Sequence, residues 1–377
     1  MSVMNSGEAM RSAWGGAPRG AVPRFSDEAN HHVSAKKRFR AWLLSLLKDR
    51  LNLKDISSFL QLPCNTWIFG ALPPWLSRLY LMALGALYFN IAAKDRKAIQ
   101  HSLEATLGKA ANRREARRRW TKTRSGILDH YHEKLYLAFK SYPTIRKTCL
   151  NRVKIRNLEI LDQALAQGRG VVLITGHYGA LEFMPGALAF RDYPLSVMVH
   201  CKTPRLRAIL DQRAAEANTE LMDPKSGEVF FTALDHLKRG RVVVTQCDEI
   251  NMWRPYKDKT TSFLGHTVPL DRSMDILARK SKAVVLMGLV HRLKGRRYEL
   301  ELLDPAQHPA AQGATQVSVQ CLSVLTDYIL EQPEHWYEWK KLTQFVPVPQ
   351  EVVNADKTTE RLFDSLAFHP GGVPQLG

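Results

Sequence analysis

The sequence lacks the cysteine patterns that metal centres and disulfide frameworks require. Its 5 cysteines are scattered over 377 residues, and no two of them form a Cys-x-x-Cys pair. This spacing predicts neither a zinc site nor a disulfide-linked domain, and it fits a reducing compartment. The motifs GxGxxG, GxxxxGK[ST] and GxSxG are absent as well. The chain therefore signals no dinucleotide, no nucleoside triphosphate and no serine hydrolase of the α/β-hydrolase type.

A secretory signal and a full-length apolar span are also missing. The nearly uncharged stretch 67–93 is interrupted by Pro73-Pro74 and by Arg78, after which only 15 residues remain. A bilayer-spanning helix needs about 20. We therefore expect a helical hairpin or a surface-lying helix there. Residues 1–34 lack an apolar core of signal length and predict a flexible tail, as do residues 346–377.

Positive charge is what the chain has in excess: 54 Lys and Arg face 36 Asp and Glu, a net charge of +18. Such a surface attracts anionic partners electrostatically. The basic, Trp- and Leu-containing segment 36–48 predicts either a helix in the membrane interface or an ordinary amphipathic helix on the domain. The dense positive run 113–120 is either a solvated helix face or a docking surface for an acidic carrier or lipid phosphates. No nucleic acid is expected, because helix-turn-helix, zinc and RNA-binding motifs are absent.

Strands and helices are predicted to alternate from residue 152 onward. Helices of this length between strands indicate βαβ units with right-handed crossovers. The expected fold class is α/β, with a mostly parallel central sheet flanked by helices and a helical, membrane-associating N-terminal part. The predicted strands are residues 153–156, 171–175, 195–199, 241–246, 283–290 and 298–303.

The main candidate site follows the apolar strand 171–175, where Gly176 is followed at once by His177. Open parallel sheets place their sites at the carboxyl ends of strands, and histidine is suited to proton transfer near neutral pH. Glu182 can hold the His177 ring only if His177 lies in the turn and Glu182 in the first turns of the next helix. The alternative is that His177 is only a hydrogen-bonded loop residue.

Three other charged residues follow predicted strands. Lys202 comes after strand 195–199, Asp248 after strand 241–246, and Arg272 soon after the segment 261–269. Lys202 could bring a cation beside His177. Asp248 is either a site residue or a turn residue or helix cap, and Arg272 is either a site residue or a surface charge.

The run Gly-His-Tyr-Gly-Ala-Leu-Glu at 176–182 resembles the H-x4-D/E motif of glycerolipid-type acyltransferases. More specifically, it is similar to the motif of the bacterial lipid A late acyltransferases, the lauroyl/myristoyl transferases. The ordered set of motifs strengthens the resemblance, which covers about residues 70–345. That set also contains Gln246-Cys247-Asp248, Phe263-Leu264-Gly265 and the closing run 333–340, Pro-Glu-His-Trp-Tyr-Glu-Trp-Lys. The sequence departs from the family where Ala180-Leu181 replaces Asn-Trp, and where Leu270 and Ser273 stand in place of Thr and Gly.

The resemblance implies an O-acyltransferase that moves a fatty acyl chain from a thioester, either acyl carrier protein or CoA, to a hydroxyl of a lipid A-like or other glycolipid acceptor. His177 would be the general base and Glu182 its partner. Gly179, Lys202, Asp248 and Arg272 would bind substrate, the oxyanion meeting backbone N–H groups around Gly179 or the Lys202 ammonium. No metal or organic cofactor is implied.

The expected location is the cytoplasmic face of the inner membrane, as a peripheral or monotopic protein on an anionic surface. A lysophospholipid or aminolipid acceptor, or a non-catalytic membrane-binding relative, stays open. The predicted divisions are residues 1–34 as a tail, 35–94 as membrane-associating helices, 95–345 as the acyltransferase domain and 346–377 as a second tail.

Overall fold

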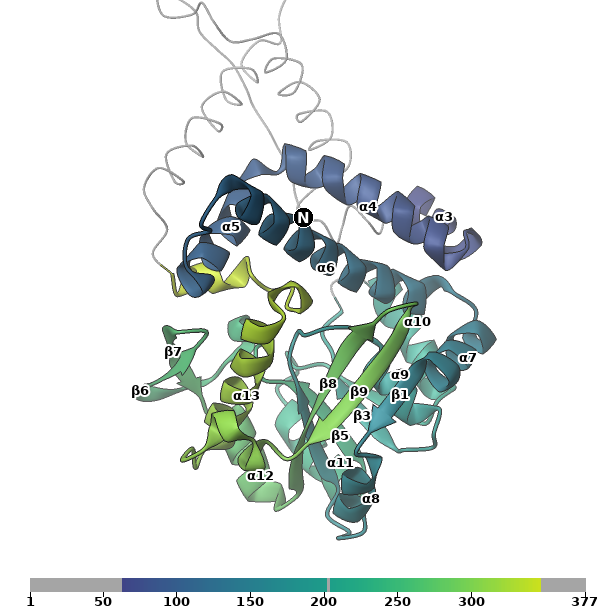
Figure 1. The fold of residues 1–377 in the computed structure, drawn as a ribbon. Coiled ribbons are helices and arrows are strands. Elements are labelled where there is room, and N and C mark those ends of the chain that lie inside the picture. Colours follow the sequence, from purple (N-terminus) through teal and green to yellow (C-terminus); the bar gives the residue numbers. More distant parts are fainter. Residues whose placement is uncertain (1–62, 202–203, 347–377) are drawn as a thin grey trace, which may run out of the picture. The chain divides into compact units, whose positions relative to one another are not determined.

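The computed structural model describes residues 63–201 and 204–346, which are built around a seven-stranded, mostly parallel sheet (Figure 1). The predicted α/β class is therefore confirmed. The strand order is β1-β9-β8-β2-β5-β3-β4. The strands are β1 Val153–Arg156, β2 Val171–Thr175, β3 Leu195–Met198, β4 Thr219–Met222, β5 Val242–Gln246, β8 Val284–Leu293 and β9 Arg297–Leu303.

Strand β2 lies in the middle of this sheet and runs parallel to both of its neighbours, β5 and β8. All five of its residues are buried. Successive side chains of a strand point to opposite faces, so both faces of β2 must be covered. Val171 and Leu173 pack into one hydrophobic core, and Val172 and Ile174 pack into the other.

Helices form a layer on each face of the sheet. Buried side chains of α7 (Tyr142–Arg152), α8 (Leu158–Leu165) and α9 (Phe183–Ala189) belong to the core that contains Val171. Those of α11 (Val229–Lys238), α12 (Ser273–Ser281) and α13 (Val317–Glu331) belong to the core that contains Val172. Helix α10 (Pro204–Ala215) precedes β4.

The N-terminal helices extend the second core. They are α3 (Pro63–Ala71), α4 (Pro74–Ile91), α5 (Ala93–Leu107) and α6 (Arg113–Phe139), and α4 lies along α6 (Figure 1). The break at Pro73-Pro74 and the helix end at Gly108, whose φ is 76°, agree with the sequence pattern. At the start of α6 the Asn112 side chain accepts the Glu115 N–H, which caps the helix.

Within the described residues, no single helix is both long and apolar enough to cross a bilayer. Helices α4 and α5 meet that test only as a pair, and they are bent by 93°. The basic segment 36–48, predicted to lie in the membrane interface, falls outside the described residues.

Several elements differ from the sequence-based expectation. Two features were not predicted: the β6–β7 hairpin (Pro255–Phe263 and His266–Asp271) and the short strand β4. Strand β6 is largely exposed and polar and gives little apolar signal, and β4 has only 4 residues. Strand β9 pairs antiparallel with β8. Helix α11 begins at Val229, after a turn in which the Ser226 hydroxyl accepts the N–H of Glu228.

Candidate active site

The candidate site begins where β2 ends, in a turn that is fixed on both sides. Gly179 has a φ of +59°, and a Cβ there would lie 1.7 Å from the carbonyl oxygen of Val290 in β8. Only glycine fits this position, because it combines a left-handed backbone with direct contact to another strand. On the other side, Tyr178 forms a β-bridge with Trp336 of the C-terminal segment. His177 is therefore held in a rigid turn.

The imidazole of His177 is paired with the carboxylate of Asp248. His177 Nδ1 lies 2.9 Å from Asp248 Oδ1, and the His177 backbone N–H also donates to this carboxylate, at 2.9 Å to Oδ2. The indole N–H of Trp336 donates to Oδ2 at 2.7 Å. Asp248 is fully buried, so these donors replace the water that its charge would otherwise need. The arrangement leaves Nε2 as the ring nitrogen that faces away from Asp248.

Strand register explains why these two residues meet. Thr175 of β2 is paired with Gln246 of parallel β5, and the Cys247 N–H donates to the Thr175 carbonyl. His177 and Asp248 each lie two residues beyond a member of that pair, at the same edge of the sheet. Neighbouring parallel strands thus bring His177 and Asp248 to one place.

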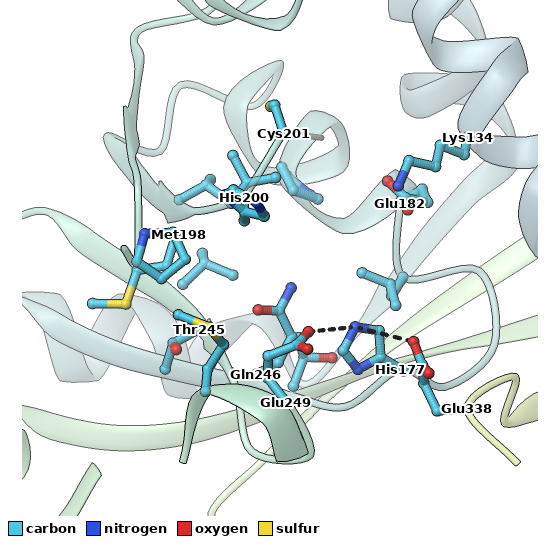
Figure 2. Close-up of a pocket in the computed structure, with 18 of the residues that line it drawn as sticks. Lys134, His177, Glu182, Met198, His200, Cys201, Thr245, Gln246, Glu249 and Glu338 are labelled. Atoms are coloured by element: carbon cyan, nitrogen blue, oxygen red, sulfur yellow. Dashed lines mark ion pairs between the residues drawn. The ribbon is translucent and has the colours of Figure 1, made fainter. Parts of the chain in front are cut away.

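Two further carboxylates approach Nε2 of His177 from opposite sides (Figure 2). Glu249 Oε2 lies at 3.2 Å and Glu338 Oε1 at 4.0 Å. The ammonium of Lys341 joins them, at 2.9 Å from Glu249 and 3.1 Å from Glu338. Three carboxylates and one lysine therefore surround the His177 ring.

This surrounding charge changes the proton affinity of the site. Burial lowers the pKa of His177, but the carboxylates of Asp248, Glu249 and Glu338 outweigh it and raise that pKa to about 10. Burial raises the pKa of Glu249, and the His177 and Lys341 charges outweigh it and lower that pKa to about 2. Burial opposes ionisation of Asp248 too, yet His177 and Trp336 hold its pKa below the usual value. The free site therefore contains an imidazolium near neutral pH.

Glu182, expected to hold the His177 ring, lies elsewhere in the structure. It is the residue before α9, and its carboxylate is 3.8 Å from Nε2 of His130. Figure 2 places Glu182 beside Lys134, across an open space from His177. The carboxylate that holds the ring is Asp248, because the chain turns into α9 after Gly179 and carries Glu182 away from Nδ1.

The other expected substrate-binding residues have different outcomes. The Gly179 N–H donates to the carbonyl of His335 at 2.8 Å, so it is already used within the protein. Arg272 is exposed and lines the same cavity as His177. Asp248 contacts the His177 ring and does not line the cavity. Lys202 lies outside the described residues.

His177 opens onto a cavity of about 1570 Å³. This volume exceeds that of ordinary small-molecule sites and suits a long, chain-like ligand. Side chains of the sheet edge, of α5, α6 and α12, and of the C-terminal segment line it. Among the residues that the structure describes, no three His, Cys, Asp or Glu side chains gather as metal ligands would. Apolar lining residues include Leu181, Phe190, Phe230, Met274 and Leu277.

Sequence reasoning did not assign roles to Glu249, Trp336, Glu338 or Lys341. Glu249 could have been found, because it directly follows Asp248 at the end of a predicted strand. Trp336, Glu338 and Lys341 stand far from His177 in the sequence and reach it only by the return of the C-terminal segment to the turn after β2.

A buried histidine–carboxylate pair at the carboxyl edge of an α/β sheet, open to a large cavity, is typical of enzymes that use histidine as a general base. The chain belongs to the bacterial lipid A biosynthesis acyltransferase family, whose model matches residues 53–342, well over half of the sequence. It is therefore an acyltransferase, and acyl transfer to a lipid is the reaction of its family. The match starts within the segment predicted to associate with a membrane. No curated protein matches this sequence.

Proposed function

We propose that this protein transfers a fatty acyl chain from a thioester to a hydroxyl of a membrane lipid acceptor, with His177 as the general base. One observation carries the proposal: the Nδ1 atom of His177 lies 2.9 Å from the buried carboxylate of Asp248, while its other nitrogen is on the cavity side of the ring. The acceptor that fits the family best is a lipid A-like glycolipid.

The reaction needs no covalent intermediate on the protein. Nε2 of His177 takes the proton of the acceptor hydroxyl as the oxygen attacks the thioester carbonyl. The carbon–sulfur bond then breaks, and the proton passes from the imidazolium to the leaving thiolate. Asp248 fixes the ring tautomer and stabilises the charged imidazole, as the orienting carboxylate does in other histidine-based sites.

Glu182 has a different task in this proposal. Its carboxylate lies across the cavity from His177 and 3.8 Å from His130, whose buried Nδ1 has no hydrogen-bond partner among the described residues. With Lys134 beside them, these groups form a polar wall in a largely apolar cavity. We assign them to positioning the acceptor headgroup.

The donor is an acyl carrier protein or CoA thioester. Arg113, Arg114, Arg117 and Arg118 are exposed at the start of α6, and such a cluster would speed the encounter with an acidic carrier protein. Lys202 keeps its predicted role as an oxyanion donor.

The protein would work at the cytoplasmic face of the inner membrane as a peripheral or monotopic enzyme. Trp67, Trp75, Leu79 and Leu87 are strongly exposed on α3 and α4. Residues 75, 79 and 87 recur at helical spacing on α4, so their side chains share one face. An exposed apolar stripe on a protein with a net charge of +18 suits an anionic bilayer surface.

The test is mass spectrometry of total lipids from cells that lack the gene, complemented with wild type or with His177→Ala. Wild type should restore one acyl chain on one lipid class, and His177→Ala should not, although it accumulates as a folded protein. An acceptor that is a phospholipid or aminolipid would correct the proposed acceptor. Restoration by His177→Ala would refute the general-base role.

A further inference from the structure

The nitrogen that must receive the acceptor's proton is already occupied. Nε2 of His177 lies 3.2 Å from Glu249, within hydrogen-bond reach, and 4.0 Å from Glu338. Only 9% of the His177 side chain is exposed. An acceptor hydroxyl therefore cannot reach Nε2 while Glu249 stays in this position.

The two carboxylates bonded to the ring differ in how firmly they are held. Asp248 is fully buried and accepts hydrogen bonds from the His177 ring, the His177 backbone and Trp336. Glu249 is 31% exposed, lines the cavity, and has Lys341 as its second partner. Asp248 is thus a fixed support, whereas Glu249 can turn away from the ring and keep its ion pair with Lys341.

Every element packed around the ring contributes groups that affect the charge and the pKa of His177. The loop after β5 supplies Asp248 and Glu249, and the C-terminal segment supplies Tyr337, Glu338 and Lys341. Helix α6 supplies His130, which burial keeps neutral by lowering its pKa. Tyr337 packs edge-on against His177, with ring centroids 5.1 Å apart, and stacks on His130. Lys341 is the cation that opposes the three carboxylates.

We propose that Glu249 is a displaceable plug on His177. It occupies Nε2 in the free enzyme, and the acceptor hydroxyl takes its place when the acceptor binds. Glu249 then turns away from the ring and keeps its ion pair with Lys341. Glu249 and Lys341 are then positioning residues, which act on the reaction through His177. This inference rests on the function proposed above and adds a step before the chemistry.

The displacement must be accompanied by loss of one proton. In the free enzyme the ring carries protons on both nitrogens, and a ring of this kind is not a base. When Glu249 leaves, the imidazolium loses a stabilising negative charge, and Nε2 releases its proton to solvent before the acceptor covers the ring. The neutral ring then accepts the hydroxyl proton during acyl transfer. Acceptor binding is therefore coupled to proton release.

This coupling predicts a difference between two pH profiles. The acidic limb of kcat/KM reports the free enzyme, and that of kcat reports the complex with substrate. In wild type, the limb of kcat/KM should lie at least about one pH unit above the limb of kcat. Glu249→Gln keeps the shape but removes the charge, so its kcat/KM limb should fall by about 1 to 3 pH units, toward the kcat limb. Coincident limbs in wild type would overturn the proposal.

Lys341→Met tests the same idea in the opposite direction. Removing this cation leaves the carboxylates unopposed, so the pKa of His177 should rise and the kcat/KM limb should move to higher pH. The limb of kcat should move less, because Glu249 is away from Nε2 in the complex. Equal movement of both limbs would contradict a plug.

An NMR titration of the histidines in the protein without substrate provides a readout that needs no activity. The His177 resonance, assigned with His177→Gln, should titrate near pH 10 in wild type and at lower pH in Glu249→Gln. Glu220→Gln is the matched control, because Glu220 lies 3.1 Å from Nε2 of His236 and does not line the cavity. It should leave His177 unchanged.

The two kinds of failure are distinguishable. Failure of the lipid test by wild type would refute the proposed acyl transfer, whatever the NMR shows. If wild type transfers acyl groups but Glu249→Gln leaves the His177 titration unchanged, the plug is refuted and the acyltransferase proposal stands.

Discussion

At the residue scale, the site separates the tasks of carboxylates that look interchangeable in the sequence. Asp248 touches Nδ1 of His177, Glu249 touches Nε2, and Glu182 faces them across the cavity beside His130. The roles proposed for the three carboxylates differ accordingly: Asp248 supports the ring, Glu249 controls access to it, and Glu182 positions the acceptor.

The comparison of Asp248→Asn with Glu182→Gln tests this division. We expect Asp248→Asn to lower kcat on the order of 10²- to 10⁴-fold, because the charge that stabilises the imidazolium is lost. Its acidic limb should also move to lower pH, since a carboxylate that raises the pKa of His177 is gone. Glu182→Gln should instead raise KM for the acceptor and leave the limb in place. Steady-state kinetics from pH 5 to 11 measure all three quantities.

The opposite result would restore the assignment made from the sequence. A Glu182→Gln enzyme with a shifted limb, beside an Asp248→Asn enzyme with an unshifted one, would show that Glu182 holds the base in the working enzyme. Circular dichroism of both variants separates a loss of activity from a loss of fold.

The sequence predicted His177 from one local motif, and it missed the partners of His177 that lie far from it along the chain. His177 was predictable because strand, glycine turn and histidine are adjacent. The Asp248 partnership needed the pairing of Thr175 with Gln246, and no local pattern gives the order of strands in a parallel sheet. Trp336, Glu338 and Lys341 depend on where the last segment folds back, which only packing decides.

At the scale of elements, helix α6 is the part that joins the N-terminal helices to the turn that holds His177. Glu133 on α6 forms a two-pronged ion pair with Arg292 of β8, with both distances 2.8 Å, and Arg292 also donates to the Gly179 carbonyl at 2.6 Å. Earlier in the same helix, Gly126 contacts the segment before Trp336 so closely that a Cβ would lie 1.7 Å from the Glu334 carbonyl oxygen. Helix α6 thus braces both sides of the site.

The buried Glu133–Arg292 pair should contribute more to stability than the more exposed Arg78–Asp129 pair. Both side chains are largely buried, so removing one partner leaves an uncompensated charge. We expect Glu133→Ala to lower the free energy of unfolding by about 3–5 kcal/mol. The control is Asp129→Ala, also on α6, which breaks the more exposed pair with Arg78 of α4 and should cost about 1 kcal/mol or less. Urea denaturation measures both, and equal losses would contradict the assignment of α6 as a brace through Arg292.

The elements themselves were predicted where burial imposes a pattern. Strands β2 and β5 are buried apolar runs, and their ranges agree with the expectation to within one residue. Strand β6 is largely exposed and polar, and its range is set by pairing with β7. The antiparallel return of β9 beside β8 likewise reflects a short turn at Gly295 rather than a property of either strand.

At the scale of the whole molecule, the cavity must open toward a lipid for the proposed reaction to occur. Helices α4 and α5 contribute Tyr88, Phe89 and Ile99 to the cavity wall, while the outer face of α4 exposes Trp75 and Leu79. One helix therefore has a face on the substrate space and another on the surface. A protein that docks through α4 would bring its cavity next to the bilayer.

Substitution of Trp75 and Leu79 by serine tests docking through α4. Burying each of these side chains in the interface contributes about 1.5–3 kcal/mol, so the double variant should bind anionic vesicles at least about tenfold more weakly. The matched control is Leu330→Ser, which removes an exposed leucine from α13 and should leave binding unchanged. Vesicle sedimentation at low and high salt measures the effect: salt should weaken the charge contribution of both proteins alike, and the difference between them should persist. If Leu330→Ser weakened binding as much as the double variant, vesicle binding would be nonspecific and would not depend on α4. The acceptor would then have to reach His177 by another route.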